Sequence, residues 1–179
     1  MIFAERLAKI KDGEVVLVTV SPESYIEISH AIMKEMIKNR GKKGVYITLN
    51  RPYQQIEKEL LSINIDPKKT YFIDVANRKN DFSTRHCSIE SPADLTEISI
   101  AITDALSSER YQFLYIDSVQ TLSMYQNEAI AEQFLYYLSR KIRLYGITGF
   151  IVLSGGKKTK KIEDAIAQFC DNILHFSLE

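Results

Sequence analysis

Asp117 and Ser118 are the residues whose types and position are best suited to chemistry. They end the apolar run Phe-Leu-Tyr-Ile at 113–116. In enzymes that hydrolyse nucleoside triphosphates, a carboxylate at the carboxyl end of a buried strand holds the water shell of Mg²⁺. Many buried strands also end in an Asp whose side chain only caps the next turn. The pattern alone therefore leaves a metal-binding role and a structural role open.

The histidines, cysteines and serines do not form a second site. His30, His86 and His175 lack metal-ligand spacing, and Cys87 and Cys170 do not form a C-x-x-C pair. No serine stands in the Gly-x-Ser-x-Gly context of a hydrolase nucleophile. We therefore expect neither a metal site nor a disulfide scaffold, and no serine hydrolase chemistry.

One dense basic cluster, Gly-Gly-Lys-Lys-Thr-Lys-Lys, spans 155–161. Its lysines follow the glycines without an earlier spaced glycine, so it is not a Walker phosphate-binding sequence. Lys157 and Lys158 are candidates for binding an anion or contacting a neighbouring subunit. The alternative is a flexible, solvated loop. If the cluster binds a polyanion, the affinity should fall steeply with salt.

Strand and helix patterns alternate along the chain. Five apolar runs rich in β-branched or aromatic residues predict buried parallel strands, at 15–20, 45–49, 71–75, 113–116 and 149–153. Apolar residues at helical spacing lie between them, in the stripes Ile28/Ile32/Met36/Ile37, Ile56/Leu60/Leu61, Leu95/Ile98/Ile102/Leu106 and Ile130/Phe134/Leu138/Ile142. A last helix is expected over 162–169 and a closing strand over 172–176.

This alternation predicts an α/β fold. Crossover helices must connect parallel strands, and they cover both faces of the sheet, which gives a three-layer sandwich with a mostly parallel central sheet. Ser91 and Pro92 are expected to begin one of the helices. The length of 179 residues suits a single domain over 1–179.

The segment 76–91 is the least regular part of the sequence. It is polar, lacks periodicity and follows an expected strand. Ligands of open α/β sheets bind beyond the carboxyl ends of the strands, so a long loop at this place is a candidate for function. A solvated surface loop is the simpler interpretation.

The order of these motifs resembles the KaiC-like branch of the RecA superfamily of P-loop NTPases, over 15–176. The matching segments are 43–49 for the second strand, 115–118 for the acid-bearing strand, 150–154 for the next strand and 170–174 for the terminal one. The resemblance implies a RecA-like fold. In ring-forming members, the region that corresponds to 155–161 reaches toward the nucleotide of the neighbouring subunit.

The phosphate-binding loop departs from that family. After the first strand, the resemblance calls for Gly-x-x-x-x-Gly-Lys-Thr, but the chain has Thr-Val-Ser-Pro-Glu-Ser-Tyr-Ile-Glu at 19–27. The loop needs glycines to turn its N–H groups onto the phosphates, and a lysine that contacts them. Pro22 lacks an N–H, and Glu23 and Glu27 add negative charge. A standard cradle is therefore not expected.

The catalytic base departs as well. Family members follow the second strand with Thr and glutamates, one of which polarises the attacking water, whereas this chain has Thr48-Leu-Asn-Arg51-Pro. An amide and a guanidinium cannot act as a general base at neutral pH. With cradle and base missing, a structural role for Asp117 is expected, in which it caps or bonds a neighbouring loop.

Composition adds few constraints. The chain has 23 basic and 23 acidic residues, so no net field favours nucleic acid or an anionic membrane. Its apolar runs are far shorter than the ~20 residues of a membrane span, and its start lacks a signal-peptide pattern. We expect a cytoplasmic protein.

The sequence thus predicts a KaiC-like pseudo-ATPase that does not hydrolyse ATP. It would act as a signalling or scaffold domain that contacts a protein partner or its own copies, with no cofactor. The remnant of the nucleotide site would comprise Ser21, Glu23, Ser24, Tyr25, Asn50, Asp117 and Ser118. The alternative is an ATPase that binds ATP and Mg²⁺ through a non-standard loop, with Lys157 or Lys158 in place of the missing lysine.

Overall fold

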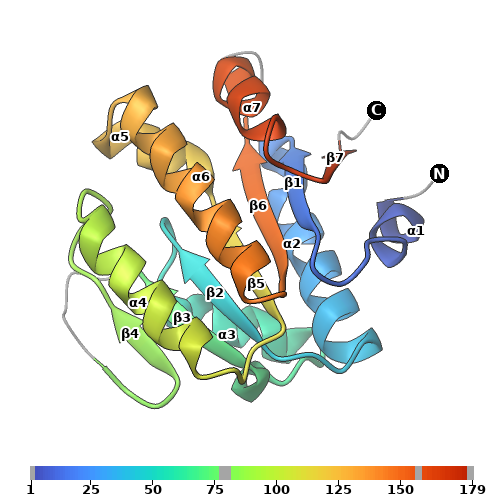
Figure 1. Cartoon of the computed structure of the whole chain (residues 1–179). Coiled ribbons are helices and arrows are strands. Elements are labelled where there is room, and N and C mark those ends of the chain that lie inside the picture. The colour runs from blue at the N-terminus through green and yellow to red at the C-terminus, as the bar shows by residue number, and fades with distance from the viewer. Residues whose placement is uncertain (1–2, 77–81, 156–158, 177–179) are drawn as a thin grey trace.

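A parallel β-sheet forms the centre of the molecule (Figure 1). The computed structural model describes residues 3–76, 82–155 and 159–176. Its strands are β1 (Val15–Val20), β2 (Gly44–Thr48), β3 (Thr70–Asp74), β4 (His86–Ser88), β5 (Phe113–Asp117), β6 (Thr148–Ser154) and β7 (Asn172–Phe176). They are arranged in the order β4-β3-β2-β5-β6-β1-β7, and every pair of neighbours is parallel.

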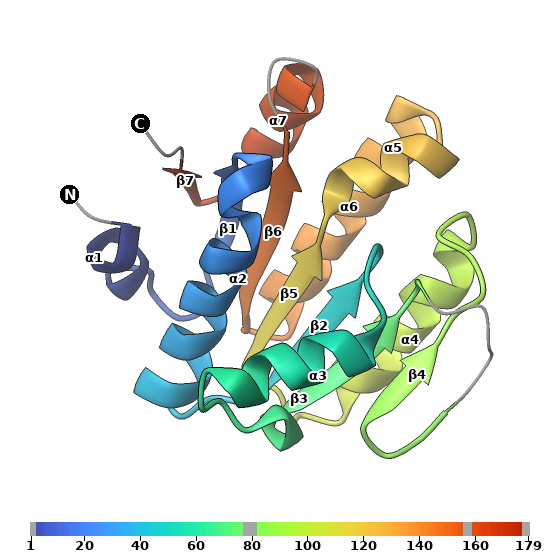
Figure 2. The ribbon, with the colours of Figure 1, turned by 180° about the vertical axis from the view of Figure 1, so that it is seen from behind.

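Helices cover both faces of this sheet. The helices are α1 (Phe3–Ala8), α2 (Tyr25–Met33), α3 (Tyr53–Ser62), α4 (Leu95–Ser107), α5 (Leu122–Tyr125), α6 (Glu128–Leu144) and α7 (Lys160–Ala167). A π-helical segment, Lys34–Asn39, continues α2, and short 3₁₀ turns lie at Pro22–Ser24, Pro67–Lys69 and Val119–Thr121. Helices α4, α6 and α7 lie on the face toward the viewer in Figure 1, and α2 and α3 cover the opposite face, seen in Figure 2.

The core consists of two apolar layers, one on each side of the sheet. Successive residues of a strand point to opposite faces, so Leu17 joins the layer under α4 and α6, whereas Val16 and Val18 join the layer under α2 and α3. A side chain at Gly149 would clash with Ile142 of α6, so this glycine lets the helix pack closely on the sheet. Burial on both faces explains why the strands are continuously apolar.

The expected three-layer α/β fold is confirmed. All six expected strands are present, with ends that differ by at most one residue from those expected. The expected helix start at Ser91 and Pro92 is wrong. Helix α4 begins at Leu95, because the carboxylate of Asp94 accepts the N–H of Glu97 at 2.9 Å and caps the helix there.

The segment 76–91 contains a strand that the sequence did not indicate. Strand β4 pairs with β3 at the edge of the sheet, and its residues are buried, so this part is not a solvated loop. Its polar His86 and Ser88 and its length of three residues hid it from a search for periodicity. Residues 77–81 of the segment lie outside the described part of the chain.

In the described part of the chain, none of the helices combines the length and the apolar character needed to cross a bilayer.

Candidate functional site

The predicted site residues lie at or just after the carboxyl ends of β1, β2 and β5. Because the strands are parallel, their carboxyl ends lie at one edge of the sheet, which is where ligands of open α/β sheets bind. Ser21 follows β1, Asn50 follows β2, and Asp117 ends β5. The predicted residues therefore lie along this edge, and their contacts decide what it can hold.

The turn after β1 uses its own hydrogen-bonding groups. Residues Pro22–Ser24 form a 3₁₀ turn that runs directly into α2. The N–H of Ser21 donates to the carbonyl of Phe176 in β7 at 3.2 Å, and the N–H of Ser24 donates to the carbonyl of Ser21 at 3.1 Å. Pro22 has no N–H, and Glu23 is exposed. Three of the four N–H positions from Ser21 to Ser24 therefore offer nothing to a phosphate.

Asp117 is fully buried. Its Oδ2 accepts a hydrogen bond from the hydroxyl of Tyr46 at 2.8 Å and lies 3.6 Å from Nη2 of Arg51. Its Oδ1 has no hydrogen-bond partner among the described residues. Burial raises the pKa of this carboxyl to about 8, because removal from water disfavours the charged form. Burial therefore favours the protonated, neutral form of Asp117. The peptide bond that joins it to Ser118 is cis.

Arg51 supplies the positive charge at this edge. The hydroxyl of Thr48 donates to the carbonyl of Arg51 at 2.6 Å, and the N–H of Arg51 donates back to it at 3.2 Å, which fixes the turn after β2. Nη1 then donates to both carboxylate oxygens of Glu59 in α3, at 2.9 and 2.7 Å. The guanidinium also lies 5.5 Å from the centre of the Tyr25 ring. The guanidinium thus lies among Glu59, Tyr25 and Asp117.

Glu59 completes the charge balance. Although partial burial opposes the charged form, the hydrogen bond and the positive charge of Arg51 lower the pKa of Glu59. Nε2 of His30 in α2 lies 3.6 Å from the same carboxylate. The network therefore links α2, α3 and β5 through side chains.

Asn50 and Ser118 form a second link. Nδ2 of Asn50 donates to the hydroxyl of Ser118 at 2.7 Å, and the hydroxyl of Thr121 donates to Oδ1 of Asn50. The amide of Asn50 is therefore bonded at both ends, and it ties the end of β2 to the turn after β5.

These groups fit a magnesium nucleotide poorly. A triphosphate needs several converging N–H donors and a cation, and Mg²⁺ needs oxygen ligands that are charged or free. The turn after β1 offers few donors, Arg51 is bonded to Glu59, and burial favours the protonated form of Asp117. Among the described residues, His, Cys, Asp and Glu side chains form no group of three or more that could hold a metal ion.

The sequence located the edge but missed its central residue. Arg51 was considered only as a failed base, and Tyr46 and Glu59 were not considered. One signal was available, since a cation directly after β2 faces an acid on the next helix. Lys157 and Lys158 lie outside the described residues, so their predicted contact stays a prediction.

Comparisons with known proteins identify a family and a similar fold. The family model for the KaiC ATPases matches residues 11–179. A crystal structure of a KaiC-like protein from the hyperthermophilic archaeon Pyrococcus horikoshii is similar to this chain, with a TM-score of 0.72 and 14% identity over 95% of this chain and 74% of the other. No curated protein matches the sequence significantly. At this identity the structural likeness shows the fold alone.

Proposed function

The chain belongs to the KaiC family of ATPases, and on that premise we propose that it is a member that does not hydrolyse ATP and acts as a signalling or scaffold domain through protein contacts. The observation that carries this proposal is the position of Arg51. Its guanidinium is held by Glu59 and lies 3.6 Å from Asp117, so an internal cation neighbours the acid that would otherwise serve Mg²⁺.

Three further features support the loss of hydrolysis. The turn after β1 has neither glycine nor lysine between Ser21 and Tyr25, and its N–H groups at Ser21 and Ser24 are used within the chain. The residues after β2, Asn50 and Arg51, cannot take a proton from water at neutral pH. Burial raises the pKa of Asp117, which disfavours its charged form. These features support a chain that keeps the family fold without a standard phosphate-binding loop or catalytic base.

In this proposal, Ser21, Ser24, Tyr25, Asn50, Asp117 and Ser118 are structural remnants of a nucleotide site, and Glu23 is an exposed remnant. Residues 1–179 form a single domain. No cofactor is required, and a cytoplasmic location follows from the same expectation.

A calorimetric titration tests the proposal. ATP with Mg²⁺, added at millimolar concentration, should give no binding heat, and phosphate release should equal that of buffer. The matched control is Asp117→Asn, which should give the same two results as the unaltered protein. Hydrolysis by the unaltered protein that Asp117→Asn abolishes would show a working site and refute the proposal.

The second candidate is an ATPase that binds ATP and Mg²⁺ through a non-standard loop. Membership of an ATPase family favours it. In that case Lys157 or Lys158 would replace the missing lysine, and the double variant Lys157→Gln/Lys158→Gln would abolish ATP binding. If the unaltered protein shows no binding heat with ATP, this candidate is refuted without the double variant.

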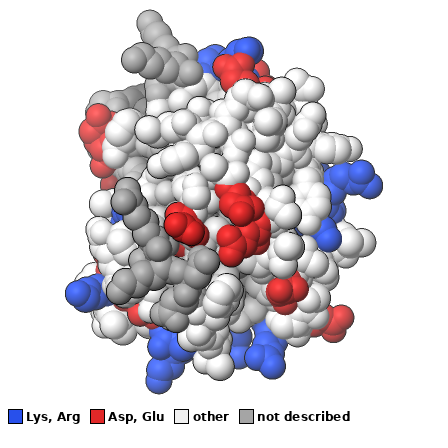
Figure 3. Space-filling view, turned by 90° about the vertical axis from the view of Figure 1, so that its left-hand side faces the viewer, with Lys and Arg blue, Asp and Glu red and all other residues white. Residues whose placement is uncertain are grey.

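The proposed partners are proteins, including further copies of this chain. Nucleic acid is not expected, because the net charge is zero. The face of the molecule beside α4 and β4 carries acidic side chains near its centre and basic ones toward its margin (Figure 3). Sedimentation velocity over a range of concentrations will show whether the chain forms dimers or larger assemblies. We expect self-association, and a monomer at all concentrations would leave a different protein as the partner.

A further inference from the structure

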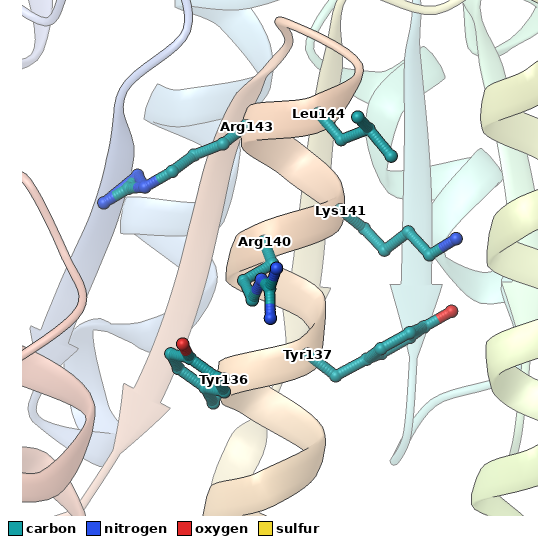
Figure 4. A pocket seen from close by; sticks show the side chains of 6 residues that line it. All are labelled: Tyr136, Tyr137, Arg140, Lys141, Arg143 and Leu144. Carbon is teal, nitrogen blue, oxygen red and sulfur yellow. The ribbon is translucent and has the colours of Figure 1, made fainter.

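The outer surface of α6 carries a hollow of about 610 Å³ along its carboxyl-terminal half. Six residues of that helix line it, namely Tyr136, Tyr137, Arg140, Lys141, Arg143 and Leu144 (Figure 4). Three are cations, two are tyrosines, one is an aliphatic residue, and none is an acid. We call this set the α6 surface.

Two cations of the α6 surface lie over tyrosine rings. Arg140 lies over the ring of Tyr136 at 5.9 Å, and Lys141 lies over the ring of Tyr137 at 5.5 Å. Each pair is separated by four residues, which places its members one above the other on a helix. Among the described residues, neither Arg140 nor Lys141 forms an ion pair with a carboxylate. Their charges are therefore open to a partner.

Arg143 behaves differently. It donates to both carboxylate oxygens of Asp171, at 3.0 and 3.2 Å, and to the carbonyl of Phe169 at 3.0 Å. These bonds tie α6 to the segment before β7. Arg143 therefore serves the fold, and the two other cations are the ones available at the surface.

The helix dipole explains only part of this composition. Cations near the carboxyl terminus of a helix are stabilised by its partial negative charge. That effect does not explain why Tyr136 is 51% exposed and Leu144 is 75% exposed beside them. Aromatic side chains and arginine are enriched at protein interfaces.

We infer that the α6 surface binds an acidic segment of a partner protein that also carries apolar residues. Carboxylates of the partner would pair with Arg140 and Lys141, and an apolar side chain would pack against Tyr136 and Leu144. Charge complementarity carries the choice of an acidic partner, since Arg140 and Lys141 have no carboxylate partner among the described residues and the lining includes no acid. The inference rests on the proposed protein-contact function and names the surface through which the contact would be made.

The tyrosines favour a peptide over a nucleic acid. Single-stranded nucleic acids bind by stacking bases on open aromatic faces. The ring of Tyr136 lies under Arg140 and meets Phe169 edge-on at 5.8 Å, and the ring of Tyr137 lies under Lys141. The hydroxyl of Tyr137 also lies 3.3 Å from that of Thr103 in α4. A cation of the same chain therefore already lies over one face of each ring, which leaves less open aromatic face for a stacked base.

Fluorescence anisotropy with a labelled peptide tests the inference. The probe is a short amphipathic peptide in which Leu and Glu residues share one face, and the matched probe has Gln at every Glu position. We expect the Glu peptide to bind and the Gln peptide not to bind. Arg140→Gln/Lys141→Gln should weaken binding about tenfold, which corresponds to roughly 1.4 kcal/mol, and added salt should weaken it further.

Lys34→Gln/Lys38→Gln is the control variant. It removes two exposed lysines from the π-helical segment after α2, on the opposite face of the sheet. It should leave peptide binding unchanged. Leu144→Ala should weaken binding while its salt dependence stays the same, because it removes only an apolar contact.

Four results would overturn the inference. These are equal binding of the two peptides, equal effects of the two double variants, tighter binding of single-stranded DNA at the same residues, and self-association without peptide that Arg140→Gln/Lys141→Gln abolishes. The last would assign the surface to a second copy, whose Glu90, Asp94 and Glu97 line a separate hollow. Nucleotide titrations are independent of these results, so each proposal can fail alone.

Discussion

The edge of the sheet at Arg51 and the α6 surface contain the same kind of contact, but its role differs between the two regions. In both regions a cation lies over a tyrosine ring, at 5.5 Å for Arg51 and Tyr25 and at 5.9 Å for Arg140 and Tyr136. Arg51 is largely buried and bonded to Glu59, whereas Arg140 is exposed and has no carboxylate partner among the described residues. The contact itself therefore does not make a binding site. A cation can bind a partner only if no group of its own chain already pairs with it.

This difference separates structural from available charge. A buried cation that has lost its water must be paired within the protein, and removal of its partner is costly. An exposed cation keeps its water and contributes little to stability, so it can pair with an incoming acid. Three variants test this division, and the largest effect is expected at the buried acid.

Asp117→Asn should change how stability depends on pH. Burial raises the pKa of Asp117 to about 8, whereas an unfolded Asp has a pKa of about 3.9. Between these values the folded state holds the extra proton, so the free energy of unfolding falls as the pH rises. The unaltered protein should lose roughly 4 kcal/mol relative to Asp117→Asn across about three pH units.

Urea unfolding at a series of pH values between about 5 and 8 measures this difference. The two curves should lie close together at the acid end and separate toward the alkaline end, where the variant becomes the more stable protein. Parallel curves would mean that Asp117 is charged over this whole pH range, which would contradict the raised pKa.

Arg51→Met should destabilise the protein by about 3 kcal/mol, because it leaves the half-buried Glu59 without its bidentate partner. Urea unfolding at neutral pH gives the value. Arg85→Met is the control, since it breaks an ion pair with Glu57 in which Arg85 is exposed, and it should cost less than about 1 kcal/mol. If both variants cost the same, Arg51 is not the structural cation of this edge.

Arg140→Gln should change the free energy of unfolding by less than about 0.5 kcal/mol, because an exposed cation over a ring is worth little in water. The same unfolding measurement applies. A loss as large as that of Arg51→Met would place Arg140 among the structural charges and remove the basis for a docking role of α6.

The arrangement of the sheet could be predicted because the apolar residues of its strands and helices follow regular patterns along the sequence. Residues 15–20 and 113–116 are apolar at every position, as strands covered on both faces must be, and the helices between them show a one-sided pattern. Strand β4 could not be predicted, because three residues with two polar side chains carry no period. Its burial depends on pairing with β3, which is a tertiary effect.

The candidate site was predictable in position and not in its contacts. Parallel strands bring the residues at and after the ends of β1, β2 and β5 to one edge whatever those residues are, so Ser21, Asn50 and Asp117 lie along the same edge. The partner of Asp117 depends on how the turn at Thr48 directs Arg51 and on where α3 places Glu59. Such contacts depend on packing in space, and the sequence pattern does not encode them.

The place of β1 in the sheet has a consequence for how the chain folds. Strand β1 lies between β6 and β7, and the N–H of Val15 donates at 2.7 Å to the carboxylate of Asp171, 156 residues away in sequence. During synthesis β1 emerges long before either neighbour, as an apolar strand with two unpaired edges. Closing contacts of such separation is slow, and an exposed apolar strand invites aggregation. We therefore expect the sheet to be completed late in folding, when β6 and β7 enclose β1.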